Sequence, residues 1–182
     1  MHFIFSTCRQ GLLAILLSLF PIIGVLAADT PIAILDFELN DLTLNLTANP
    51  VNPEEVARTS TLQPLLKNAL AAKGGYTICD IDSRNQEKAN AGLGYLYSHT
   101  DVATELGQSV GADWIVVGRL HKASFLFVYL KAQLINTKTK QVVEQYSVEI
   151  KGQQNKITPK GVDRLAQQIN DTIRSEASQP PP

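Results

Sequence analysis

Two stretches in the second half of the chain alternate between apolar and polar residues. In residues 125–136 the apolar face comprises Leu126, Val128, Leu130, Ala132 and Leu134. The opposite face carries the aromatic row Phe125, Phe127 and Tyr129, followed by Lys131 and Gln133. A period of two predicts antiparallel strands with one covered face. Residues 141–151 repeat the pattern after a polar turn at 136–140, and residues 113–122 form the preceding strand.

The first half of the chain indicates a β-α-β unit. Residues 31–39 (PIAILDFEL) form a continuous apolar stretch, typical of a strand buried on both faces. Asn52 and Pro53 predict the start of a helix that runs to Lys73, and Pro64 should kink or divide it. Gly74 and the glycine after it end this helix, and a second strand follows at residues 76–81.

Two further helices complete the pattern. Residues 98–101 offer capping groups for a short helix that ends at Gly111, whereas residues 82–96 give no clear assignment. Thr158 and Pro159 predict the start of a last helix, whose apolar face comprises Val162, Leu165, Ala166, Ile169 and Ile173. The order β-α-β-α-β-β-β-α predicts a single α/β domain over residues 28–174, with helices packed on a mixed sheet of about five strands and an α+β-like meander.

The two ends of the chain differ from this domain. Arg9 precedes an apolar run from Gly11 to Leu26, and small residues lead to Ala27. This pattern predicts a signal peptide over residues 1–27, cleaved near Ala27, and a mature protein in the periplasm without a stable membrane span. The alternative is an uncleaved N-terminal anchor. Residues 175–182 (SEASQPPP) are polar and proline-ended, so we expect a disordered tail.

Charge and motifs exclude several function classes. The chain has 16 Lys and Arg residues against 17 Asp and Glu residues, interspersed, so we expect no nucleic-acid partner. His99 and His121 lack the neighbours that a zinc site needs. The chain has no Gly-x-Ser-x-Gly element and no phosphate-binding loop, because the glycines at 74 and 75 end a helix. We therefore expect no catalytic residues, no cofactor and no enzymatic activity.

Two groups of residues remain as candidate sites. The acids Asp36, Glu38, Asp80 and Asp82 lie toward the ends of the first two strands, where open α/β sheets bind ligands and where hard cations such as Ca²⁺ find oxygen ligands. Because their spacing is not that of a calcium loop, we favour separate structural and solvent-facing roles for them. The aromatic row Phe125, Phe127 and Tyr129 is either an exposed partner surface or a face covered by a helix, and both readings stay open.

Several segments resemble a known group of proteins. They are residues 33–39 (AILDFEL), 65–82, 103–124 (which include GADWIVVG) and 130–143 (LKAQLINTKTKQVV). They resemble a family of uncharacterised bacterial periplasmic proteins and, more distantly, the N-terminal domain of TolB, the curli-secretion protein CsgG and the LpoB activator of penicillin-binding proteins. The resemblance implies their α/β domain and a part in cell-envelope machinery. It also implies an association with periplasmic quinoprotein dehydrogenases, although the family's cysteine pair is absent from residues 91–94 (AGLG).

These observations together predict a secreted, non-enzymatic accessory protein of the periplasm or cell envelope. We expect it to act through contacts with a protein partner, whose identity the sequence does not give. The alternative is a periplasmic carrier of a small ligand or a hard metal ion, which would use the acids at the strand ends.

Overall fold

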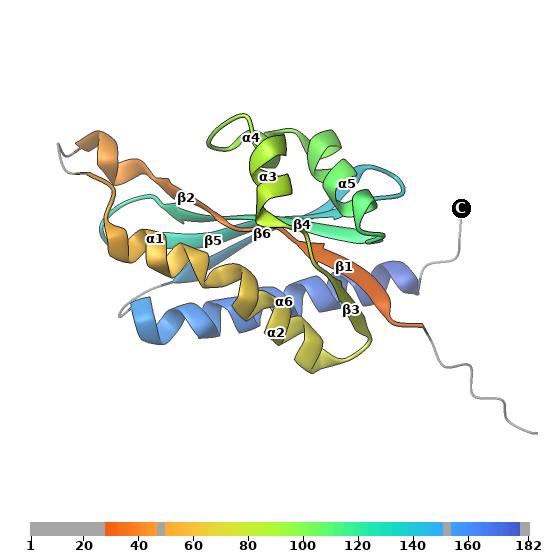
Figure 1. The fold of residues 1–182 in the computed structure, drawn as a ribbon. Helices are drawn as coiled ribbons and strands as arrows, with labels where there is room; N and C mark the ends of the chain where they lie inside the picture. The colour runs from red at the N-terminus through yellow and green to blue at the C-terminus, as the bar shows by residue number, and fades with distance from the viewer. Residues whose placement is uncertain (1–27, 47–49, 151–153, 179–182) are drawn as a thin grey trace, which may run out of the picture.

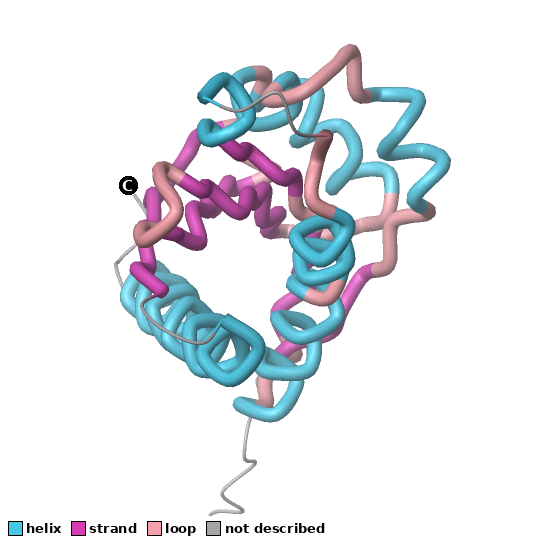
Figure 2. Tube along the Cα trace, turned by 90° about the vertical axis from the view of Figure 1, so that its left-hand side faces the viewer, coloured by secondary structure: helices cyan, strands magenta, loops and turns pink. Residues whose placement is uncertain are grey.

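One mixed β-sheet lies between two layers of helices (Figure 1). The computed structural model describes residues 28–46, 50–150 and 154–178. Helices α1, α2 and α6 cover one face of the sheet, which we term the lower face, and α3, α4 and α5 cover part of the upper face. Figure 2 views the strands nearly end-on, with helices on either side of them.

The strands follow the order β3-β1-β4-β5-β6, with β2 beside β4. They are β1 (Thr30–Ile34), β2 (Glu38–Asp41), β3 (Tyr76–Cys79), β4 (Trp114–Lys122), β5 (Val128–Asn136) and β6 (Gln141–Ile150). The pairs β1–β3, β1–β4 and β2–β4 are parallel, whereas β4–β5 and β5–β6 are antiparallel. The predicted mixed α/β fold is confirmed, with six strands in place of about five.

The additional strand arises from a break in the first one. The prediction of a single strand over residues 31–39 is wrong, because β1 ends at Ile34 and β2 begins at Glu38. At the break, the backbone N–H of Asp36 donates to Gln86 Oε1 at 2.8 Å, and the Asp36 carbonyl accepts from Gln86 Nε2 at 3.0 Å. The buried Gln86 amide thus supplies hydrogen-bond partners for the backbone N–H and carbonyl of Asp36, which lies between the two strands.

The long helix after the first strands is divided as expected. Helix α1 spans Pro53–Ser60, and α2 spans Leu62–Lys73, so Pro64 lies in the first turn of the second piece. Asn52 Oδ1 accepts the backbone N–H of Glu54 at 2.9 Å, which confirms the predicted cap. Gly74 ends α2 with φ of 72°, a conformation that glycine adopts without strain.

The segment without a sequence assignment contains two short helices, α3 (Ser83–Ala89) and α4 (Tyr95–Ser98). Helix α5 (Thr100–Ser109) follows and ends before Gly111, as predicted, although no side chain makes a capping hydrogen bond at its start. The expected capping role of residues 98–101 is therefore wrong. The backbone turn of α4 leads directly into α5 through His99, whose N–H bonds to the Tyr95 carbonyl at 2.9 Å.

The last helix, α6 (Gln154–Ala177), is longer than expected at both ends. It begins before Thr158 and Pro159, so their predicted role as its first residues is wrong. Pro159 lies inside the helix, where its missing N–H removes one backbone hydrogen bond. The helix also continues past Ser175, into the expected tail. Residues 1–27 and 179–182 lie outside the described residues, so the signal peptide and the rest of the tail stay predictions.

Each face of the sheet has its own apolar core. The alternate residues of the first strand contribute to both: Ile32 and Ile34 to the lower core, Ala33 and Leu35 to the upper core. This confirms a strand buried on both faces. The apolar face of β5 packs with the predicted face of α6 in the lower core, through Val128, Leu130, Ala132, Leu134, Val162, Leu165, Ala166, Ile169 and Ile173.

Candidate functional site

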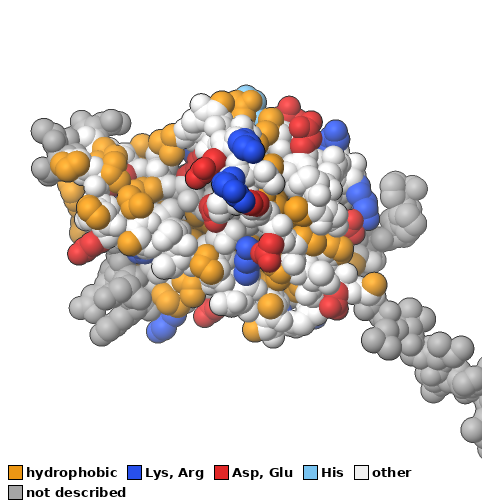
Figure 3. Space-filling model, in the orientation of Figure 1, with side chains coloured by type: hydrophobic (Ala, Val, Ile, Leu, Met, Phe, Trp, Pro, Cys, Tyr) orange, Lys and Arg blue, Asp and Glu red, His pale blue; other side chains and the backbone are white. Residues whose placement is uncertain are grey.

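Exposed apolar side chains gather at one end of the molecule. We term this group the apolar tip; it comprises Leu42, Val51, Val56, Phe125, Leu126 and Phe127. The tip is built from the short 3-10 helix η1 (Leu42–Leu46), the start of α1 and the connection between β4 and β5. Figure 3 shows hydrophobic side chains concentrated at the end where β2 and α1 lie. Phe125 is 66% exposed and Leu126 is 78% exposed, so the tip is open to solvent.

The predicted aromatic row does not lie on one strand face. Strand β5 begins at Val128, so Phe125 and Phe127 belong to the connection that precedes it, and both are exposed. Tyr129 lies on β5, half-buried, with its ring centroid 6.4 Å from that of His121. The expectation that Leu126 faces the core is also wrong.

A tight loop explains this difference. Ser124 Oγ accepts the backbone N–H groups of Leu126 and Phe127, at 3.2 and 3.1 Å. The N–H of Ala123 donates to the Phe127 carbonyl at 3.0 Å. These bonds close the chain on itself, so the alternation of residues 125–127 does not correspond to a strand. They also constrain the backbone of the loop that carries the exposed side chains.

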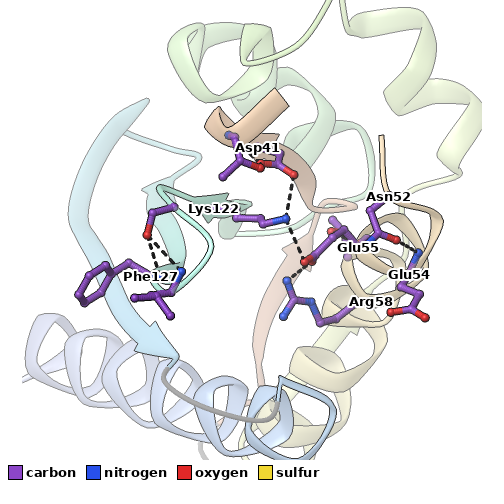
Figure 4. A network of polar contacts seen from close by, with 11 residues as sticks. Asp41, Asn52, Glu54, Glu55, Arg58, Lys122 and Phe127 are labelled. Atoms are coloured by element: carbon purple, nitrogen blue, oxygen red, sulfur yellow. Dashed lines mark hydrogen bonds and ion pairs between the residues drawn. The ribbon is translucent and has the colours of Figure 1, made fainter. Parts of the chain in front are cut away.

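A buried ion network lies beneath the apolar tip (Figure 4). Lys122 Nζ, at the end of β4, lies 3.2 Å from Asp41 Oδ2 and 3.4 Å from Glu55 Oε1. Arg58 forms a second ion pair with Glu55 within α1. The side chains of Asp41, Glu55 and Lys122 are 2%, 8% and 10% exposed. The network therefore ties β2, β4 and α1 together where they carry the tip.

Asp41 is also bonded to the first turn of η1. Its Oδ1 accepts the Thr43 hydroxyl at 2.6 Å and the Thr43 backbone N–H at 2.9 Å. Burial alone raises the pKa of Asp41, but the hydrogen bonds from Thr43 and the bond and charge of Lys122 outweigh it. The net effect lowers the pKa of Asp41 below its usual value.

This shift predicts a loss of stability in acid. Because the pKa of Asp41 is lower in the folded protein than in the unfolded chain, the stabilisation is present above the unfolded value of about 4 and is lost as the pH falls through the folded value. We expect the free energy of unfolding of wild type to decrease from pH 5 downward, and that of Asp41→Asn to decrease less over the same range. Urea unfolding at several pH values measures this. Parallel curves for the two proteins would contradict it.

The first two candidate acids each have a separate structural partner. Asp36 Oδ2 accepts the hydroxyl of Ser83 at 2.8 Å, at the start of α3. Glu38 Oε2 accepts the backbone N–H of Gly94 at 2.9 Å, whereas its buried Oε1 has no hydrogen-bond partner within the described part of the chain. Both carboxylates thus hold the segment of α3 and α4 onto the sheet.

The other two acids are also engaged separately. Asp80 pairs with Lys67 at 2.6 Å, and Asp82 caps α3 through the backbone N–H of Arg84 at 2.8 Å. Hydrogen bonds from Arg84 lower the pKa of Asp82. Among the described residues, no group of three or more His, Cys, Asp or Glu side chains is placed to hold a metal ion. The structure therefore does not bring the four acids together as a site.

Two sequence motifs meet on the lower face of the sheet. The ring of Phe37, next to the break in the first strand, packs directly on Gly118 of β4, and a Cβ atom at position 118 would overlap it. Phe37 belongs to the segment AILDFEL and Gly118 to GADWIVVG, which both carry the family resemblance. Their joint presence therefore has a packing reason: the ring needs a strand residue without a side chain.

Comparison with known families identifies the family of this chain. The model of the DUF3280 family, described as "Protein of unknown function (DUF2380)", matches residues 30–169. The chain belongs to the DUF3280 family. The match spans the sheet from β1 to β6 and most of α6. A search of curated proteins gave no match to the DUF3280 chain.

Solved structures show that this DUF3280 protein has an LpoB-like α/β fold. LpoB from E. coli is 17% identical with a TM-score of 0.50; the match covers 70% of this chain and 59% of LpoB. PelC from Paraburkholderia phytofirmans, solved as a dodecamer, is 12% identical with a TM-score of 0.52; the match covers 77% and 86%. At these identities the likeness concerns the fold. Within the described residues of the DUF3280 chain, no helix has the length and apolarity needed to cross a membrane.

Proposed function

We propose that this DUF3280 protein is a non-enzymatic accessory protein of the periplasm or cell envelope, which binds a protein partner through its apolar tip. The exposed tip over a buried ion network is the observation that carries the proposal. The predicted signal peptide supports the location, and the resemblance to envelope proteins supports the class of function. An association with a periplasmic quinoprotein dehydrogenase is the specific system that the sequence resemblance favours.

The composition of the tip favours a protein partner. Aromatic and aliphatic side chains at the centre of a patch are typical of protein interfaces, where a few of them supply most of the binding energy. Amphipathic surfaces that bind membranes usually place exposed Lys and Arg beside their apolar residues. Here Lys122 and Arg58, the cations beneath the tip, are largely buried in ion pairs with acids. They are not presented to lipid headgroups.

The rigidity of the tip supports the same role. The hydrogen bonds of Ser124 hold Phe125, Leu126 and Phe127 in one loop conformation, and Lys122 Nζ lies 5.8 Å from the centroid of the Phe125 ring. A surface that is ordered before binding loses less conformational entropy when the partner docks. The ion network then contributes to binding indirectly, because it fixes α1 and η1 relative to this loop.

We expect the double variant Phe125→Ser/Phe127→Ser to fold normally and to bind its partner at least about thirtyfold more weakly, since interface aromatics contribute roughly 2 kcal/mol or more. The full-length protein is used to isolate a partner from periplasm of its native host. Mass spectrometry then identifies the partner, and calorimetry with purified partner measures the dissociation constants of wild type and variant.

Leu93→Ser provides a matched control. Leu93 is 73% exposed in the connection between α3 and α4, outside the tip. This variant should bind the partner like wild type. The proposal is wrong if the tip variant binds as tightly as wild type, or if the Leu93 variant is equally impaired. If the tip variant instead loses binding to lipid vesicles, the tip is a membrane-binding surface. If it loses self-association measured by ultracentrifugation, the tip binds a second copy of the chain.

A further inference from the structure

The helices leave part of the upper face of the sheet uncovered. A hollow of about 320 Å³ lies there, bordered by β2, α4, β4, β5 and β6. Its lining residues include Asn40, Tyr97, Arg119, His121, Lys131 and Ser147. This volume is within the range of small-ligand sites. The hollow is separate from the tip residues and from the four candidate acids, none of which lines it.

Three basic side chains face this hollow from two neighbouring strands. Arg119 and Lys131 are directly opposed in the antiparallel β4–β5 pair, and His121 lies two residues from Arg119 on the same face. Like charges at directly opposed positions destabilise a sheet. Within the described part of the chain, neither Arg119 nor Lys131 forms an ion pair with a carboxylate. Both cations are therefore left without a direct ion pair among these residues.

Two acids lie on neighbouring strand positions, but neither lines the hollow. Glu38 is opposite Arg119 in the β2–β4 pair, but its Oε2 is committed to the N–H of Gly94. Glu149 is opposite Tyr129 in the β5–β6 pair and does not line the hollow. The lining itself contains only basic and neutral side chains. Arg119 and Lys131 thus supply two positive charges to a lining that has no carboxylate among the described residues.

Arg119 is held in position by an aromatic ring. Its Cζ lies 3.5 Å from the centroid of the Tyr97 ring, a stacked cation–π arrangement. Its Nε is buried and has no hydrogen-bond partner among the residues that the structure describes. A guanidinium fixed by stacking directs its N–H donors along its own plane, which suits the two oxygens of a carboxylate or phosphate. The pKa of His121 is lowered by burial and by the charges of Lys131 and Arg119, in agreement with a positive site.

We propose that this hollow binds the oxyanion group of a small molecule, a carboxylate or a phosphate, through Arg119, Lys131 and His121. Arg119 donates in-plane hydrogen bonds from its stacked position, and Lys131 supplies a second charge from the neighbouring strand. Neutral groups at the edge, such as Asn40 and Ser147, are available to contact the rest of the ligand. This binding site is independent of the proposed partner surface at the apolar tip.

Calorimetric titration of the full chain with inorganic phosphate and, separately, with malonate tests the proposal and distinguishes the two oxyanion chemistries. We expect at least one anion to bind wild type at low ionic strength. Its affinity for Arg119→Gln and for Lys131→Gln should each be roughly tenfold lower than for wild type. Chloride at equal ionic strength separates specific binding from screening.

Lys160→Gln is the matched control, because Lys160 is exposed on α6, which covers the lower face. It removes one positive charge elsewhere and should leave the affinity unchanged. Circular dichroism establishes that each variant is folded. If Arg119→Gln does not fold, Lys131→Gln still tests the site, because it leaves the Tyr97–Arg119 stack in place. Failure of both anions to bind wild type would overturn the proposal. Equal weakening in all three variants would also overturn it, because it would indicate general charge attraction.

Discussion

Replacement of Lys122 by methionine is expected to lower the free energy of unfolding by about 3–5 kcal/mol, the usual cost of removing one partner from a buried ion pair. Lys122 Nζ lies within ion-pair distance of both Asp41 and Glu55. Without it, the buried Asp41 carboxylate loses its ion pair, and Glu55 keeps only its pair with Arg58. This loss is a large part of the total stability of a domain of this size.

Urea unfolding of two reference variants makes this expectation specific. Lys67→Met removes a cation from the pair with Asp80, whose side chain is 79% exposed, and should cost no more than about 1 kcal/mol. The double variant Lys122→Met/Asp41→Asn removes one charge of each sign, leaves the Glu55–Arg58 pair in place and should recover part of the stability lost in Lys122→Met. If Lys122→Met costs no more than Lys67→Met, the network does not hold this end of the molecule together.

Replacement of Gly118 by alanine is expected to destabilise the protein by about 1–3 kcal/mol, because the new Cβ overlaps the ring of Phe37. The ring is 8% exposed and lies between β4 and the break in the first strand, so it has little room to move away. Urea unfolding at neutral pH measures the loss.

A double-mutant cycle attributes this loss to the contact itself. Phe37→Ala alone removes a buried aromatic side chain and should cost about 3–5 kcal/mol. In Gly118→Ala/Phe37→Ala the overlap is gone, so the combined cost should fall below the sum of the two single costs by at least about 1 kcal/mol. Additive costs would show that Gly118 is required for a reason other than the Phe37 ring.

The parts of the fold that depend on local sequence were predictable. The Asn52–Pro53 cap, the division of the helix near Pro64 and the alternation of residues 144–150 each follow from neighbours in the chain. The predicted face of this strand is wrong at Val142, which packs in the upper core because the β5–β6 register shifts there. The break at residues 35–37 was not predictable in this way, because it depends on Gln86, some 50 residues away in the sequence. The apolar pattern continues through the break and gives no sign of it.

The candidate site was predicted in part. Phe125 and Phe127 are exposed, and one of the two readings of the aromatic row required this, but Tyr129 lies apart from them. The loop that separates them is closed by Ser124, whose role depends on hydrogen bonds to the backbone and leaves no periodic pattern. The ion network was missed for another reason. Asp41 and Lys122 are register partners of β2 and β4, and no local spacing relates them.

The hollow on the upper face was missed because its basic residues come together only through strand register. Arg119 and Lys131 are twelve positions apart in the sequence, and their pairing becomes evident only when the β4–β5 register is known. Tyr97 comes from α4, a short helix that begins at the end of the segment without a sequence assignment. A charge count for the whole chain conceals such a local concentration of positive charge, because the acids elsewhere balance it.

The central claim is that the apolar tip contacts a protein partner, and site-specific photo-cross-linking in the native host's cells tests it most directly. A photoreactive amino acid replaces Leu126 in one strain and Leu93 in another; both positions are exposed, at 78% and 73%. The account predicts one discrete adduct with another protein from position 126, absent from position 93 and abolished by Phe125→Ser/Phe127→Ser. The same adducts from both positions, or none from position 126, would contradict it.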